Sequence, residues 1–184
     1  MTIKKFLPVA LMIAVVAALY VVVVQYLKIS ALWVPFISWP LYFIAGAKPS
    51  RLHKEIIALT GGIIFGYLTL VIVVPFTKLF GGTLGLPLTV FIVAFSIVML
   101  ELTDWFELAP AYFFSYAGYF AYVFGGFGGQ GATYTSAMFP YWVLLMAGLA
   151  LGYLTAVFRK KILEKEGVFG KDQETVFDKE QAAR

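Results

Sequence analysis

The sequence predicts an all-α membrane protein with six transmembrane helices in two inverted three-helix repeats. Three observations lead to this fold class. Of the 184 residues, 61% are hydrophobic and 13% are charged, whereas about a quarter of the residues in a soluble domain are charged. The apolar residues gather in six runs, each close to the ~20 residues that a helix needs to cross a bilayer. Two short motifs also recur in the same order in the two halves of the chain.

The predicted spans follow one another closely along the chain. The first begins after Lys4 and Lys5 and is too long for the apolar core of a typical secretory signal, so we expect it to be retained. The second contains Pro35 and Pro40, which a membrane helix tolerates at the cost of a kink. The six spans cover residues 6–26, 29–47, 56–77, 84–102, 108–125 and 138–158.

Two stretches lie outside these spans. Residues 125–137 are rich in glycine and uncharged, which predicts a flexible or re-entrant loop on the outer side. Residues 160–184 alternate in charge, which predicts a solvated cytoplasmic tail, and a docking segment for a cytosolic partner is the alternative. The predicted organisation is therefore a first repeat over residues 1–81, a second repeat over residues 82–159 and a tail over residues 160–184.

Lysine and arginine residues predict the orientation, because they are enriched on the cytoplasmic side of membrane proteins. One side of the predicted membrane carries only Lys28 and Lys78. The other side, which we predict to be cytoplasmic together with both termini, carries Lys4, Lys5, Lys48, Arg51, Lys54, Arg159, Lys160 and Lys161. The protein is therefore expected in the cytoplasmic (inner) membrane.

Acidic residues also lie on the predicted cytoplasmic side. Glu101 and Asp104 are too close to the end of the fourth span to form a proton relay at the membrane centre. We expect them to be solvated or paired with a basic residue of the same surface, namely Lys48, Arg51 or Lys54. We expect His53 and Glu55 to belong to that surface as well.

The first repeated motif, S-[W/Y]-x-x-Y-F, begins at Ser38 and again at Ser115, on the second and fifth spans. Spans three apart cross the bilayer in opposite directions, and such inverted repeats are common in transporters and channels. Serine and tyrosine four residues apart share a helix face. Their hydroxyls either line a solute path or bond to backbone carbonyls and facing helices. The candidates for a solute path are Ser38, Tyr42, Tyr112, Ser115, Tyr116 and Tyr119.

The second motif, G-x-x-x-G-Y-L-T, begins at Gly62 on the third span and at Gly148 on the sixth. Small residues four apart allow two helix backbones to approach closely, and the threonine adds a hydrogen bond. We expect these two spans to cross each other, or a neighbouring subunit, at the faces formed by Gly62, Gly66, Thr69, Gly148, Gly152 and Thr155.

Composition excludes several classes of function. The chain has no cysteine and one histidine, so neither a thiolate site nor a histidine cluster forms within one chain. Residues 56–77 and 108–158 contain no charged side chain, which argues against a pump or a proton-coupled carrier. The glycines that follow residue 124 lack the lysine of a phosphate-binding loop. We therefore expect no catalytic residues, no metal, no cofactor and no nucleic-acid partner.

Aromatic and small residues in the second, fifth and sixth spans follow a family pattern. In the second span they are Trp33, Phe36, Tyr42 and Phe43, and in the fifth they are Pro110, Phe113, Phe120 and Ala121. The sixth span is rich in small residues and ends with Gly152 and Tyr153. With these residues the chain resembles the YcdZ-like bacterial inner-membrane proteins (domain of unknown function 1097). The resemblance implies a small multi-helix inner-membrane protein without an assigned biochemistry, and it supplies no functional residues.

The leading functional hypothesis is a passive channel or facilitator for a small uncharged solute, because the repeat is inverted and the spans lack buried charge. A single copy has few helices with which to enclose a pore, so a homo-oligomer in the lipid bilayer is expected. The alternative is a structural or accessory subunit of a larger membrane complex. An enzymatic role has no support in the sequence.

Overall fold

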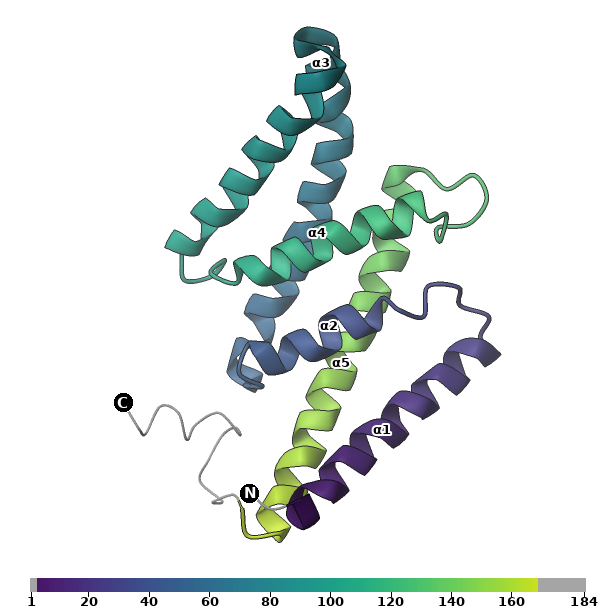
Figure 1. Cartoon of the computed structure of the whole chain (residues 1–184), viewed down its shortest axis with the longest axis vertical. Helices are drawn as coiled ribbons and strands as arrows, with labels where there is room; N and C mark the ends of the chain where they lie inside the picture. Colours follow the sequence, from purple (N-terminus) through teal and green to yellow (C-terminus); the bar gives the residue numbers. More distant parts are fainter. Residues whose placement is uncertain (1–2, 169–184) are drawn as a thin grey trace. The chain divides into compact units, whose positions relative to one another are not determined.

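The computed structural model describes residues 3–168, and every regular element in that range is helical (Figure 1). This confirms the predicted all-helical class. The longer helices are α1 (Ile3–Tyr26), α2 (Pro35–Ile44), α3 (Leu52–Met99), α4 (Ala109–Phe124) and α5 (Tyr134–Lys165). Two short 3-10 helices, Pro49–Arg51 and Leu100–Leu102, flank α3.

Three helical runs in the described part of the chain are long and apolar enough to cross a membrane. They are Ile3–Tyr26, Pro49–Leu102 and Tyr134–Lys165. The helices therefore support a membrane protein, with three runs of spanning length where the sequence predicts six spans.

The third predicted span and most of the fourth lie within α3, which bends at Gly81, and the last three residues of the fourth span form the 3-10 helix Leu100–Leu102. This residue has φ 81° and ψ 165°, which are not helical angles, and the helix folds back on itself there (Figure 1). The two segments, residues 52–80 and 82–99, come close enough that a Cβ on Gly85 would lie 2.5 Å from the Cα of Thr77. The predicted break between residues 77 and 84 is thus a glycine bend, and the two helical segments are in contact close to it.

The second predicted span is much shorter than expected, because α2 contains only 10 residues. At 1.5 Å per residue its length is about 15 Å, roughly half of the hydrocarbon core. The helix begins at Pro35. Proline has no backbone N–H, which is tolerated here because the N–H groups of a first helical turn have no partner within the helix. It ends before Gly46, which has a φ of 103°. The 16 residues of α4 span about 24 Å.

The last helix, α5, begins earlier and ends later than predicted. Thr133 and Ser136 bond reciprocally, with 2.9 Å from the Thr133 amide to Oγ of Ser136 and 3.1 Å from the Ser136 amide to Oγ1 of Thr133. This reciprocal bonding resembles a capping box and starts the helix inside the predicted outer loop. Residues 160–165 of the predicted tail are helical too. Residues 169–184 lie outside the described part of the chain.

The chain forms two compact units. Of the described residues, the first unit contains 3–52 and 147–168, and the second contains 53–146. Each unit therefore combines helices from both predicted repeats. In the first unit Val9 of α1 packs against Leu163 of α5, and Leu41 of α2 is buried. In the second unit Leu59 and Ile97, from the two segments of α3, are buried.

Candidate functional site

We call the first repeated motif, S-[W/Y]-x-x-Y-F, the serine motif and the second, G-x-x-x-G-Y-L-T, the glycine motif. In the first unit, α2 lies directly against the part of α5 that carries the glycine motif. A Cβ on Gly152 would lie 2.8 Å from the Cβ of Tyr42, and one on Gly148 would lie 2.6 Å from the Cα of Pro35. Real Cβ atoms do not approach other atoms so closely, so glycine is required at both positions. We call this packing the α2/α5 contact.

In the second unit, α4 lies against the first segment of α3 in the same manner. A Cβ on Gly62 would lie 2.7 Å from the Cβ of Ser115, and one on Gly66 would lie 2.7 Å from Cδ1 of Tyr119. We call this packing the α3/α4 contact. In both contacts a serine and a tyrosine, four residues apart, face two glycines, four residues apart.

A side-chain hydrogen bond completes each contact at the last residue of the glycine motif. The indole Nε1 of Trp39 donates to Oγ1 of Thr155 at 2.9 Å. The hydroxyl of Tyr116 lies 3.1 Å from Oγ1 of Thr69. Each threonine hydroxyl also donates to the carbonyl oxygen four residues earlier, at 2.7 Å in α5 and 2.9 Å in α3. Since a hydroxyl has one proton, Tyr116 is the donor to Thr69.

The two contacts therefore match at three positions, and their partners are exchanged between the predicted repeats. The serine motif of the first repeat meets the glycine motif of the second repeat in the α2/α5 contact. The serine motif of the second repeat meets the glycine motif of the first in the α3/α4 contact. The sequence analysis expected the two glycine faces to cross each other or a neighbouring subunit. In the described residues the faces lie against α2 and α4.

The repeated hydroxyl residues lie inside their own units. Ser38, Tyr42, Tyr112, Ser115 and Tyr119 are buried, and Tyr116 is partly buried. In the second unit Oγ of Ser115 donates to the carbonyl of Leu59 at 2.6 Å, and the hydroxyl of Tyr119 donates to the carbonyl of Tyr134. These bonds to facing backbone support the packing alternative for the two hydroxyls.

One ionisable residue is placed differently from the sequence prediction. Glu55, expected on the cytoplasmic surface, is fully buried. It lies seven residues before Gly62, just as Tyr141 lies seven residues before Gly148. Tyr141 is also buried, and its hydroxyl donates to the carbonyl of Ser115 at 3.1 Å. The register of the glycine motif, extended backwards by two turns, was the signal that could have identified this buried position.

The acidic loop after α3 pairs with the start of α3, which confirms the expectation for Asp104. Nζ of Lys54 lies 2.8 Å from a carboxylate oxygen of Asp104 and 3.0 Å from one of Glu107. The Asp104 side chain is 81% exposed. Exposed ion pairs of this kind contribute little to stability. The pairs of Lys54 with Asp104 and Glu107 are therefore surface features and not part of a site.

Within residues 3–168, no group of three or more histidine, aspartate or glutamate side chains is placed to hold a metal ion. A family model for a protein of unknown function (DUF1097) matches residues 10–161. No curated protein and no solved structure matches the chain. The chain therefore belongs to the DUF1097 family.

Proposed function

We propose that this member of the DUF1097 family is a passive channel or facilitator for a small uncharged solute, with two inverted halves in the cytoplasmic membrane. The observation that carries the proposal is the pair of short helices α2 and α4. They occupy corresponding positions in the two halves and carry the same motif. In transport proteins, unusually short apolar segments at corresponding positions of two repeats point to the binding site.

The chemistry of the two contacts supports an uncharged solute. Their motifs offer hydroxyl groups, one indole and backbone carbonyls, and they contain no charged side chain. The buried Glu55 lies in the first turn of α3, close in sequence to the basic residues 48–54, and not at the middle of a span. A mechanism driven by protonation would need ionisable groups near the membrane centre. The proposal therefore contains no coupled ion and no catalytic step.

The proposed path-lining side chains are the hydroxyl residues of the short helices, namely Ser38, Tyr42, Tyr112, Ser115, Tyr116 and Tyr119. A solute would exchange hydrogen bonds with these hydroxyls and with the carbonyls they contact. A homo-oligomer is part of the proposal, because six helical segments enclose little space in one copy.

The test is the flux of glycerol, urea and water into liposomes that contain the purified protein. Tyr42→Phe and Tyr119→Phe remove a hydroxyl and keep the ring, and we expect each to change the flux of at least one solute by twofold or more. Tyr26→Phe is the matched control, because Tyr26 is 85% exposed at the end of α1. An absence of protein-dependent flux for every solute would contradict the proposal.

The second candidate function is a structural or accessory subunit of a larger membrane complex. It is favoured by the internal bonding of Ser115 and Tyr119 and by α1, since only 11% of the residues in its most apolar stretch are buried. Its test is purification in a mild detergent. A stable partner at constant stoichiometry would support this function, whereas a homo-oligomer alone would count against it.

A further inference from the structure

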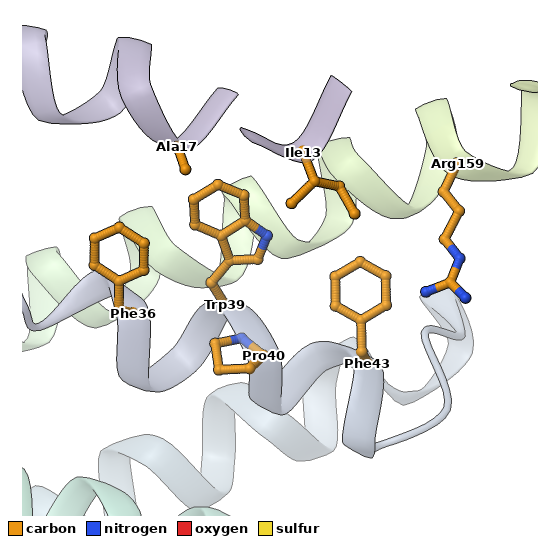
Figure 2. Close-up of a pocket in the computed structure, with 7 residues that line it drawn as sticks. All are labelled: Ile13, Ala17, Phe36, Trp39, Pro40, Phe43 and Arg159. Atoms are coloured by element: carbon orange, nitrogen blue, oxygen red, sulfur yellow. The ribbon is translucent and has the colours of Figure 1, made fainter. Parts of the chain in front are cut away.

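A cavity of about 300 Å³ lies in the first unit, between α1, α2 and α5. Figure 2 shows Arg159 of α5 at one end, with aromatic rings of α2 in a row leading away from it. The walls are apolar apart from this arginine, and they include Ile13 and Ala17 of α1 and Phe36, Trp39 and Phe43 of α2. The volume is at the lower end of the range typical of small-molecule sites, roughly 300–1,000 Å³.

The guanidinium of Arg159 is held between aromatic rings. Its Cζ lies 5.7 Å from the ring centre of Phe6 and 5.8 Å from that of Phe43. The Nε atom is buried and has no hydrogen-bond partner among residues 3–168. A guanidinium presents several N–H groups in a planar fork, which matches the oxygens of a phosphate group. The rings of Phe6 and Phe43 thus position the guanidinium at the end of the cavity, and its buried Nε–H is not satisfied by any described residue.

The charged end of the cavity lies at the ends of two helices. Arg159 is followed by Lys160 and Lys161, and Phe6 is preceded by Lys4 and Lys5. Basic residues at the ends of apolar helices lie at the level of the lipid headgroups. The other end extends along α2 among apolar side chains, and the indole N–H of Trp39 is bonded to Thr155. A ligand that fits both ends has one anionic group and a long apolar chain.

We propose that this cavity binds one anionic phospholipid, with its phosphate on Arg159 and an acyl chain along Phe43, Trp39 and Ala17. Basic pockets between membrane helices are known to take anionic headgroups. Inorganic phosphate has the charge but not the chain, and phosphatidylcholine has the chain but no net negative charge. The site is separate from the hydroxyl residues proposed to line a solute path.

The experiment is native mass spectrometry of the full-length protein in mild detergent, titrated with phosphatidylglycerol or with phosphatidylcholine of the same acyl chains. We expect phosphatidylglycerol to bind about tenfold more tightly, because Arg159 and the adjacent Lys160 and Lys161 repel the quaternary ammonium of phosphatidylcholine, whereas phosphatidylglycerol keeps a net negative charge. Arg159→Gln is expected to remove this difference. Lys161→Gln is the matched control, since it removes the same charge from an exposed position two residues away, and it is expected to change binding by less than about twofold.

A second variant tests the apolar end without altering the charge. Ala17→Phe fills the space beside Trp39 and is expected to weaken the binding of both lipids, with an unchanged helical circular dichroism spectrum. Millimolar inorganic phosphate is expected not to displace phosphatidylglycerol. The proposal is overturned if the two lipids bind equally, if Arg159→Gln and Lys161→Gln behave alike, or if phosphate displaces the lipid. It is also overturned if Ala17→Phe changes the oligomeric mass, because the cavity would then be an interface between copies.

Discussion

Trp39 and Tyr116 occupy the same position of the repeated motif and differ in chemistry, yet both donate to a threonine hydroxyl of the other motif. The indole and the phenol have different lengths and shapes. The two contacts therefore share a hydrogen-bond donor that reaches the threonine hydroxyl from the same motif position, and they do not share a particular side chain. This explains why the second letter of the motif varies while its serine and last two aromatics do not.

We expect the two donor–threonine bonds to have similar energies. In double-mutant cycles, Trp39→Phe with Thr155→Val and Tyr116→Phe with Thr69→Val should each give a coupling energy of about 0.6 kcal/mol, the average for such bonds in membrane proteins. The measurement is reversible unfolding in detergent. The mixed pair, Trp39→Phe with Thr69→Val, should be additive, because its members belong to different bonds. A coupling near zero in only one of the two cycles would show that the contacts are not equivalent.

At the scale of helices, the bend of α3 depends on a single residue. A Cβ at Gly81 would meet nothing within 4 Å, so space does not restrict this position. The backbone angles restrict it, because the region around φ 81° and ψ 165° is essentially limited to glycine. A Cβ at the neighbouring Gly82 would also meet nothing within 4 Å, and the φ of Gly82 is not positive.

Gly81→Ala should therefore destabilise the protein by about 1–3 kcal/mol, the typical cost of such a strained backbone. Gly82→Ala, one residue away, should be neutral or slightly stabilising because alanine favours a helix. Thermal unfolding of both variants in the same detergent checks the difference. Equal midpoints for the two variants would mean that the bend does not require glycine.

Most helices could be located from the sequence, and the reasons differ by element. Helices α1 and α5 and the two segments of α3 follow from long apolar runs. The length of α2 could not be predicted from hydropathy, because the helix starts at Pro35 and stops before Gly46, and both ends lie inside a continuous apolar stretch. The early start of α5 depends on bonds between Thr133 and Ser136, whose short polar side chains are equally common in loops.

At the scale of the whole molecule, the sequence predicted packing faces but not their partners. Glycine spacing identifies a face on one helix, and the identity of the facing helix depends on the path of the chain. The same limit applies to Glu55, which looked like a surface residue because basic residues surround it in sequence. Its burial follows from its register on α3, which a hydropathy average does not resolve.

The proposed inverted topology can be tested by labelling, because the chain contains no cysteine. Single cysteines introduced by Thr83→Cys and Gln130→Cys should react with a membrane-impermeant maleimide added to intact cells. Those introduced by Glu101→Cys and Lys161→Cys should react only after the membrane is permeabilised. All four positions are exposed in the structure. Labelling of the Glu101→Cys variant in intact cells would contradict the inverted arrangement.

The exchange of partners between the two contacts also has a consequence for biogenesis. The bond that closes the α3/α4 contact joins residues 47 positions apart, whereas the one that closes the α2/α5 contact joins residues 116 positions apart. The ribosome has therefore made the partner of α4 before α4 itself, but α2 must wait until most of the chain has been synthesised. A truncated nascent chain leaves α2 without the glycine face of α5. The first unit is thus completed last, although it contains the beginning of the chain.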